Sequence, residues 1–328
     1  MRFGVTYDLR ADYLAQGLGD EETAEFDSEV TIAAICGALE ALGHEPVRIG
    51  SVQRLAEQLV AGDRWDAVFN ICEGLKGVSR EAQVPALLEA YDVPYVFSDP
   101  LTLALALDKG MAKRVVRSAG VPTPDFAIIE CADDTLGVDL PYPLFLKPVA
   151  EGSGKGVDAK SRVGDRASLQ RVAKDLLRRF RQPVLVETFL PGREFTVGVT
   201  GTGAEAAALG VMELMWTGKA AEHGYGYENK EHFEEKMTYR LAEDRAAEEA
   251  IGVALGAWRA LRCRDGGRVD IRFGDDGKAY FLEVNPLAGL NPDRSDLVFI
   301  TRFKGLSYRD LIGRIVDSFL RRHPEIRQ

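Results

Sequence analysis

The sequence has no long hydrophobic run, and its start shows no signal-peptide pattern. No stretch approaches the roughly 18 apolar residues that span a bilayer, and Asp8, Arg10 and Asp12 interrupt the apolar residues near the start. Hydrophobic residues make up 46% of the chain and charged residues 28%, which is typical of a folded globular protein and not of a disordered one. We therefore expect a cytoplasmic protein with no membrane partner.

Cysteine and histidine are both scarce. The four cysteines lie far apart without paired spacing, so the sequence has neither a zinc ribbon nor a redox pair. The four histidines are too scattered for a metal cluster. Cys72 lies next to Glu73, but no histidine near it in the sequence could activate a thiol, so we expect Cys72 to be a core residue.

Basic residues are outnumbered, because 41 Lys and Arg face 51 Asp and Glu and give a net charge of -10. Proteins that bind nucleic acid usually carry a basic stripe, so we expect no nucleic-acid partner. An anionic substrate must meet a local group of basic residues. With 328 residues the chain is long enough for two or three domains.

The order of the expected elements divides the chain into three parts. Residues 1–99 alternate strands and helices, apart from a polar acidic loop at 8–27, and this alternation predicts a parallel α/β sheet. Residues 100–190 contain strands around a glycine-rich turn and one amphipathic helix near 166–180. Residues 191–328 add further strands, a long helix, a hairpin and a closing helix.

The segment 268–285 alternates polar and apolar residues around an Asp-Gly pair, which predicts a hairpin with a two-residue turn. In the register of such a turn, Asp270 faces Glu283 and Arg268 faces Asn285. Opposed Cβ atoms would lie about 5 Å apart on one face of the hairpin. The other face would take the apolar side chains of Val269, Ile271, Leu282 and Val284.

Two carboxylates and an amide oxygen held this close repel one another unless a cation lies between them. An all-oxygen ligand set suits Mg²⁺ bound together with nucleotide phosphates. Asp270, Glu283 and Asn285 are therefore candidate metal ligands. The alternative is an exposed hairpin with a solvated polar face.

Two further segments have the chemistry to bind a nucleotide. An apolar strand ends in Lys147 and is followed by a loop, residues 151–157, with three glycines and Ser153, whose N–H groups and hydroxyl can cradle phosphates. A second strand carries Glu187 into a Pro-Gly turn that ends at Glu194, and it can present backbone groups to adenine and a carboxylate to ribose. Taken alone, each segment has a plain alternative, a hairpin for the first and a hinge for the second.

In order and spacing, these segments resemble the ATP-grasp superfamily and, within it, the D-alanine–D-alanine ligase family. The resemblance covers nearly the whole chain and implies an α/β fold. Its parts would be a parallel N-terminal domain (1–99), a small central lobe (100–190) and a C-terminal mixed-sheet domain with the metal site (191–328), with ATP between the last two. Other segments that agree are Glu73-Gly74, Arg80-Glu81, Leu87-Leu88-Glu89, Pro94-Tyr95, Leu107-Asp108-Lys109 and Gly120-Val121-Pro122-Thr123-Pro124.

The resemblance implies a nucleotide role for each matching residue. Lys109 and Lys147 would neutralise the ATP phosphates, while Ser153 and Gly154 would close over them. Adenosine would be held by Glu187, Leu190 and Glu194, the first two at adenine and the third at ribose.

It also implies the catalytic groups. Asp270, Glu283 and Asn285 would bind two Mg²⁺ ions, with Mn²⁺ as a substitute, and Arg268 would steady an acyl phosphate and the oxyanion. The segment from 216 to 236 would be the lid that shields this intermediate from water, with Lys230 matching the lysine of the family's loop. The alternative for that lysine is a solvated side chain among glutamates.

The implied activity is that of an ATP-dependent ligase for small molecules, which activates a carboxylate as an acyl phosphate and joins it to an amine in an amide or peptide bond. The family also forms dimers through its first domain, so the resemblance allows a homodimer.

The sequence departs from the family where substrate is recognised. Glu231 follows the loop lysine in place of the usual tyrosine, and no histidine occurs around Glu73 where one is expected. Asp27 aligns with the acid that binds the first substrate's amino group, and Ser295 matches the serine for the second substrate's carboxylate after a one-residue shift. We expect altered specificity. The alternatives are a genuine D-alanine–D-alanine ligase and a non-catalytic nucleotide-binding module of the same fold.

Overall fold

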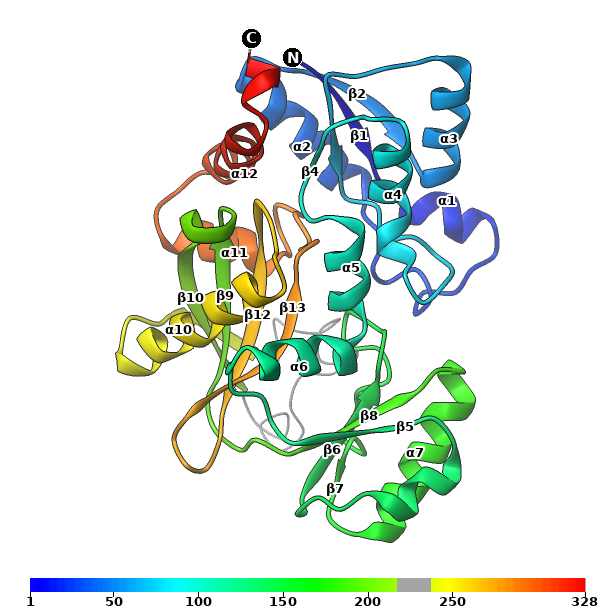
Figure 1. Ribbon diagram of the computed structural model, residues 1–328, viewed down its shortest axis with the longest axis vertical. Helices are drawn as coiled ribbons and strands as arrows, with labels where there is room; N and C mark the ends of the chain where they lie inside the picture. The colour runs from blue at the N-terminus through cyan, green and yellow to red at the C-terminus, as the bar shows by residue number, and fades with distance from the viewer. Residues whose placement is uncertain (217–236, 328) are drawn as a thin grey trace.

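A computed structural model describes residues 1–216 and 237–327 and shows three β-sheets with helices packed around them (Figure 1). The first sheet lies at the top of the view near both termini, the central sheet at the bottom, and the C-terminal sheet between them. Across the described residues, none of the helices combines the length and apolar character that a membrane-spanning helix needs.

The first sheet is parallel, as the alternation of strands and helices predicts. Its order is β2-β1-β3-β4, with β1 at Arg2–Thr6, β2 at Glu45–Gly50, β3 at Ala67–Asn70 and β4 at Tyr95–Val96. Its helices are α2 (Glu29–Ala41), α3 (Val52–Ala61) and α4 (Gln83–Ala90), the last preceded by the short turn η1 (Arg80–Ala82). The loop expected at 8–27 is partly wrong, because α1 (Arg10–Ala15) lies within it.

Two helices follow the first sheet and join it to the rest of the chain. Asp99 caps α5 (Pro100–Leu107) by accepting from the Thr102 N–H, and α6 (Lys109–Ser118) follows at once. Ala112 and Val116 of α6 are buried in the core beneath the C-terminal sheet. This packing fixes Lys109, the first residue of α6, relative to that sheet.

The central sheet is antiparallel in the order β5-β8-β6-β7. Its strands are β5 (Phe126–Ile129), β6 (Leu144–Pro148), β7 (Arg162–Val163) and β8 (Val184–Thr188), with the short turn η2 (Ala132–Gly137) after β5. The predicted helix α7 (Arg166–Phe180) buries Leu169, Val172 and Leu176 against one face. The opposite face of the central sheet lies across a cavity from the C-terminal sheet.

The C-terminal sheet has the order β11-β10-β9-β12-β13, and each of these neighbouring pairs is antiparallel. The expectation of a mixed sheet is therefore wrong for the described strands; short connections, which favour antiparallel pairing, join β9 to β10 and β12 to β13. The strands are β9 (Glu194–Thr200), β10 (Ala207–Trp216), β11 (Met237–Leu241), β12 (Gly266–Phe273) and β13 (Ala279–Asn285).

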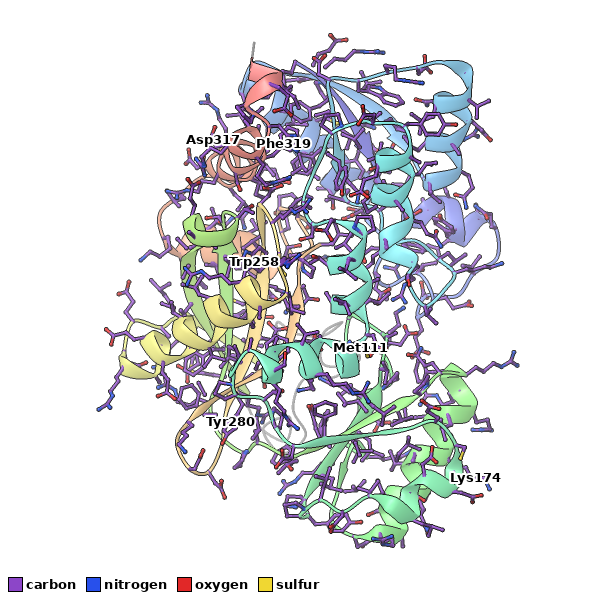
Figure 2. All side chains as sticks on the ribbon, in the orientation of Figure 1. Met111, Lys174, Trp258, Tyr280, Asp317 and Phe319 are labelled. Carbon is purple, nitrogen blue, oxygen red and sulfur yellow. The ribbon has the colours of Figure 1, made fainter. Side chains whose placement is uncertain are left out.

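Helices cover both faces of the C-terminal sheet. Helix α10 (Arg245–Ala260) lies on one face, where fully buried Trp258, labelled in Figure 2, donates from its indole to the Gly201 carbonyl at 3.2 Å. Helix α11 (Asp296–Phe303) packs on the other face, and α12 (Tyr308–Arg322) packs on α2. The remaining short helical turns are η3 (Gly203–Glu205) and η5 (Pro324–Arg327).

The hairpin of β12 and β13 brings the predicted residues opposite each other. Asp270 pairs with Glu283 and Arg268 with Asn285. The predicted two-residue turn is wrong, because the loop spans 274–278 and the Gly274 N–H donates to the Lys278 carbonyl at 3.0 Å. A register shift next to Asp270, typical of a β-bulge, restores the predicted pairing.

The bulge changes which side chains of β13 enter the core. Phe281 and Val284 are both buried in the core beneath the sheet, whereas Leu282 lines a cavity on the same side as Glu283. The prediction that Leu282 lies on the core face is therefore wrong. The extra residue turns Leu282 and Glu283 to one side.

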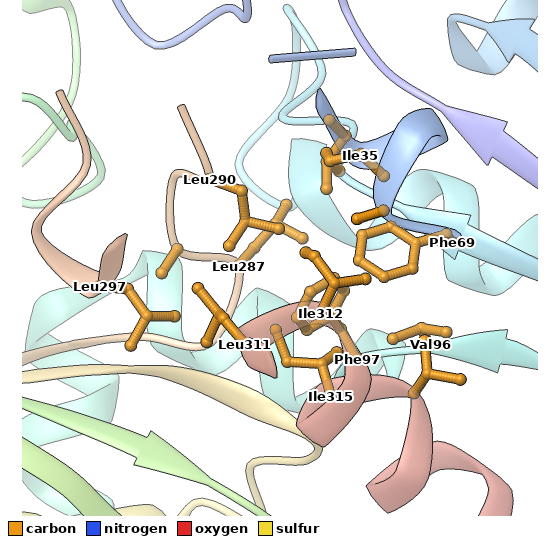
Figure 3. Close-up of a cluster of buried hydrophobic side chains, with 14 of the residues drawn as sticks. Ile35, Phe69, Val96, Phe97, Leu287, Leu290, Leu297, Leu311, Ile312 and Ile315 are labelled. Carbon is orange, nitrogen blue, oxygen red and sulfur yellow. The ribbon is translucent and has the colours of Figure 1, made fainter. Parts of the chain in front are cut away.

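The first and last parts of the chain share one apolar core, which Figure 3 shows. From the first domain come Ile35, Phe69, Val96 and Phe97, and from the C-terminal part come Leu287, Leu290, Leu297, Leu311, Ile312 and Ile315. All ten are buried. Apolar burial contributes roughly 25 cal/mol per Å² of area removed from water, so this core holds the two regions together and fixes the cavity between them.

Candidate active site

Two cavities lie on the inner faces of the domains. The larger, ≈ 810 Å³, lies between the first domain and the loop that follows β13, and the smaller, ≈ 90 Å³, lies between the central and C-terminal sheets. Both are lined by the same five residues, Lys109, Glu151, Ser153, Arg268 and Glu283. The cavities therefore meet at a polar junction where a group could pass from one to the other.

The smaller cavity collects the residues predicted to bind nucleotide. Its lining includes Lys109, Lys147, Ser153, Gly154, Glu187, Leu190 and Glu194. Phe145, Val157, Phe189 and Leu282 add apolar surface, so the slot combines apolar walls with a few polar groups, as is usual for small-molecule sites. Arg272 also lines it and pairs with Glu194 at 3.2 Å.

The charged side chains of this cavity alternate in sign. Lys147 Nζ lies 3.6 Å from Glu187 Oε1 and 3.4 Å from Glu283 Oε2, and Lys109 Nζ lies 3.6 Å from the same Glu283 oxygen. Lys109 Nζ also donates to the Glu151 carbonyl at 2.6 Å. Buried charges persist only when they are paired and hydrogen-bonded, so this alternation allows the four side chains to lie together.

The pKa values of these groups follow from the pairing. Burial works against the charged form of Lys147, but the carboxylates of Glu187 and Glu283 outweigh it and raise its pKa. Burial likewise opposes ionisation of Glu283, yet Lys109, Lys147 and Arg268 outweigh it and lower the pKa of that carboxyl. Both residues are therefore charged at neutral pH.

The predicted metal ligands lie around Asp270. The Thr196 hydroxyl donates to Asp270 Oδ1 at 2.8 Å, while the Arg268 guanidinium and, at 3.4 Å, Asn285 Nδ2 both contact Oδ2. Burial, only partly offset by Arg268, raises the pKa of Asp270 to about 6. Two carboxylates and an amide oxygen on neighbouring strands fit part of an octahedral, all-oxygen Mg²⁺ shell that phosphates and water can complete.

Arg268 lies at the junction of the cavities. Besides pairing with Asp270, its Nε is 3.7 Å from Asp296 Oδ2 at the start of α11. A guanidinium held by two carboxylates presents its donors in a fixed orientation. It is therefore placed to contact an anion that bridges the two cavities.

The glycine-rich loop is attached to the first domain by Glu25. The Gly152 N–H donates to Glu25 Oε1 at 2.6 Å, and the Arg80 guanidinium bonds both Glu25 at 3.0 Å and the Ala150 carbonyl at 2.9 Å. A Cβ at Gly152 would lie 2.5 Å from the Glu25 carboxylate, so only glycine fits there. Burial opposes ionisation, but Arg80 and Lys155 outweigh it and lower the pKa of Glu25.

The larger cavity has an acidic wall that differs from this paired arrangement. Asp27, Glu73 and Glu81 line it, and within the described chain none of them forms a salt bridge. Burial raises the pKa of Asp27 and of Glu81 to about 7, and it raises that of Glu73 well above its usual value. We call these three carboxyls the acidic wall; Arg80 favours the charged forms of Glu73 and Glu81, but burial outweighs it.

Ser295 also lines the larger cavity, immediately before α11. Its hydroxyl accepts from the Asn291 N–H at 2.8 Å, which shapes the loop after β13. Lys230 and Glu231 lie outside the described residues, as does the expected lid except for Trp216, which ends β10. Cys72 is buried, as expected, and all four cysteines are unpaired.

Sequence reasoning missed several polar residues that complete the site. Thr196, Arg272 and Glu25 hold predicted residues in place, but each comes from a strand or loop distant in the sequence. Lys113, which lies 2.8 Å from Glu187, had a usable signal. It follows Lys109 by four residues, a spacing that places both on one face of a helix, here α6.

Comparisons with known proteins agree with this geometry. Residues 115–317 match the family model described as D-ala D-ala ligase C-terminus. The chain is 33% identical to a D-alanine–D-alanine ligase of Cupriavidus pinatubonensis over 305 residues, which cover 89% of this chain and 88% of the relative. It is 32% identical to the uncharacterized protein y4sG of Sinorhizobium fredii over 271 residues, 78% of this chain and 75% of that protein.

Solved structures share the fold. A Bacillus anthracis D-alanine–D-alanine ligase complexed with ATP superposes with a TM-score of 0.72 and 22% identity, covering 99% of both chains. The D-Ala:D-Ser ligase VanG of Enterococcus faecalis gives 0.73 at 19% identity, covering 97% of this chain and 99% of that one. The fold expected from the motifs is confirmed. The sequence relatives and the family model together show that the chain belongs to the D-alanine–D-alanine ligase family of ATP-dependent, amide-forming ligases.

Proposed function

We propose that this ligase phosphorylates a carboxylate bound in the larger cavity and couples it to an amine other than D-alanine. The observation that carries the proposal is the acidic wall of Asp27, Glu73 and Glu81. A pair of alanines supplies few positive groups for three unpaired carboxyls, so we infer that at least one substrate carries an additional cationic group. Glu73 also lies in the region where the family pattern leads us to expect a histidine.

The nucleotide is assigned to the smaller cavity. Lys109 and Lys147 neutralise the phosphates, and Ser153 and Gly154 cover them from the glycine-rich loop. Adenosine contacts come from Glu187, the backbone of Leu190, and Glu194. The alternating charges of this cavity support this assignment, because phosphate oxygens can replace Glu283 in its contacts with the lysines.

The metal is assigned to Asp270, Glu283 and Asn285, as two Mg²⁺ ions for which Mn²⁺ can substitute. When bound, the ions supply positive charge to the β- and γ-phosphates. Thr196 orients Asp270 for this role. Arg268 steadies the transferred phosphoryl group and the oxyanion that forms when the amine attacks the acyl carbon.

The proposed reaction has two steps. A carboxylate oxygen attacks the γ-phosphorus and ADP leaves, and the amine then attacks the acyl carbon, loses a proton and expels phosphate. The junction lined by Ser153 and Arg268 connects the nucleotide cavity with the substrate cavity. We also propose the residues of segment 216–236, with Lys230 and Glu231, as the cover that keeps water from the acyl phosphate.

ADP release with Mg²⁺-ATP and pairs of amino acids tests the proposal. Pairs that include a basic or diamino acid should give ADP and a condensed product, and each substrate omitted in turn should stop release. A strong preference for two D-alanines would overturn the proposed specificity. Failure of every pair, with ATP still bound, would favour the non-catalytic module.

We further propose a homodimer formed through the first domain and a cytoplasmic location, where ATP and Mg²⁺ are available. Light scattering of the purified protein tests the first point. A monomeric mass at micromolar concentration would contradict it.

A further inference from the structure

Lys113 is a fully buried lysine that lines neither cavity. Its Nζ lies 2.8 Å from Glu187 Oε2, 3.0 Å from Thr123 Oγ1 and 3.3 Å from the Phe281 carbonyl. Its ammonium donates hydrogen bonds to Thr123 and the Phe281 carbonyl and forms an ion pair with the Glu187 carboxylate. The Lys113 side chain therefore extends from α6 to Glu187 without entering the nucleotide cavity. The Glu187 side chain lines that cavity from β8.

Such a lysine is costly to bury, so its retention needs a reason. Burial lowers the pKa of Lys113 to about 8, even though Glu187 acts in the opposite direction. An apolar pair of similar volume would often be as stable as a buried ion pair. A structural role alone gives no reason for a charge at this position.

The charge network suggests what the ammonium does. Glu187 has two cations beside it, Lys113 at one oxygen and Lys147 at the other. In the proposed function Lys147 neutralises ATP phosphates, which draws its charge away from Glu187. Lys113 has no contact with the phosphate end, so it is the cation that stays with Glu187 when nucleotide binds.

We propose that Lys113 is the positioning residue for Glu187, holding its carboxylate ionised and aimed at the 6-amino group of adenine, and so sets the preference for adenine over guanine nucleotides. A carboxylate accepts a hydrogen bond from a 6-amino group and repels a 6-oxo group. If Glu187 rotated or became neutral, both purines would be tolerated. This inference rests on the proposed placement of adenine beside Glu187, and it needs no assumption about the ligated substrates.

Binding of AMP-PNP and GMP-PNP with Mg²⁺ measures this preference directly by calorimetry. We expect the ratio of the two affinities to fall by about tenfold or more in Lys113→Met, because a hydrogen bond to a charged group is lost. Lys113→Gln keeps two N–H donors but no charge, and it should show the same loss of preference. It replaces Lys113→Met as the test if that variant does not fold. Lys113→Arg restores the charge and should recover most of the ratio.

Two controls separate positioning from general damage. Arg322→Met breaks the ion pair with fully buried Asp265, 2.6 Å away, and lines neither cavity, so it should lower the melting temperature without changing the ratio. The double variant Lys113→Met/Glu187→Gln should be no less selective than Glu187→Gln alone, because Lys113 acts through Glu187.

A wild-type ratio in Lys113→Met or Lys113→Gln would overturn the inference. So would an equal loss of selectivity in Arg322→Met. The proposed ligation is tested separately by ADP release, so a chain that fails to ligate the amino-acid pairs but shows these binding ratios would refute the substrates and keep the role of Lys113.

Discussion

The two cavities differ in how their charges are balanced. In the nucleotide cavity, Lys147 and Glu187 have partners of opposite sign from other elements, and Lys109 shares the Glu283 carboxylate. In the larger cavity, Glu73 and Glu81 have no such partner in the described chain. The nucleotide site thus has its charges paired within the protein, whereas the acidic wall of the substrate cavity forms no salt bridge within the described chain.

This difference corresponds to two parts of the proposed reaction, phosphoryl transfer and substrate recognition. Phosphoryl transfer needs fixed cations and metal ligands whatever carboxylate is activated. Recognition of the carboxylate and the amine depends on the surroundings of the acidic wall. Substitutions on the two sides should therefore affect different kinetic constants.

The largest effect is expected at the metal ligands. Asp270→Asn or Glu283→Gln should lower kcat for ADP formation by about a thousandfold, because charge stabilisation of the transferred phosphoryl group is lost. The matched control is Asp276→Asn in the loop of the same hairpin, which lines neither cavity and should change kcat less than twofold. Near-normal kcat in the first two variants would contradict the metal assignment.

The acidic wall should control substrate affinity without affecting ATP. Glu73→Gln combined with Glu81→Gln should raise KM for a cationic substrate by about ten- to a hundredfold, since charge-assisted hydrogen bonds are lost. KM for ATP should stay within twofold of the wild-type value. Steady-state kinetics with each substrate varied in turn measures both constants, and an equal rise in the two would remove the distinction between the cavities.

A smaller effect is expected from Thr196, which contacts Asp270 but is not itself proposed to bind the metal or the nucleotide. Thr196→Val keeps the shape of the side chain and removes the donor to Asp270 Oδ1, so kcat should fall by about tenfold. Thr200→Val on the same strand is the matched control, because Thr200 lines neither cavity. Equal losses in the two variants would show a packing effect.

The smallest effect concerns stability and pH. The raised pKa of Glu81, about 7, means that the folded protein holds this proton more tightly than the unfolded chain does. The resulting stability is present below the ordinary carboxyl pKa and is lost as the pH rises through about 7. Glu81→Gln should therefore raise the melting temperature at pH 8, by about 2–4 °C per kcal/mol, and gain little at pH 5. Thermal unfolding at both pH values measures this, and an equal gain at both would exclude the titration.

Much of the fold followed from local pattern. The helix at 166–180 has the predicted bounds because its periodicity is strong and Asp165 and Ser168 form a capping box. The parallel first sheet followed from the alternation of elements. The short helix α1 was missed, since six residues with no buried side chain give a weak apolar signal.

In the hairpin of β12 and β13, the facing residues were predicted correctly although the length of the loop was not. The Asp-Gly pair located the turn region and the facing residues, but the five-residue loop and the bulge compensate each other in register. Only the pairing of β12 with both β9 and β13 reveals the bulge and the longer loop. The position of Leu282 could not be predicted for that reason.

The sequence by itself determined the chemistry of the nucleotide end, because lysines, glycines and carboxylates at fixed spacing on strands and turns are local properties of the chain. Only the tertiary structure decided how charges from distant segments are paired, since Lys113, Glu187, Glu283 and Glu25 come from four separate elements or loops. It alone showed that the carboxylates of one cavity form salt bridges and that the acidic wall of the other forms none within the described chain. Pairing over distance depends on packing, and packing is the part of the structure that no local pattern contains.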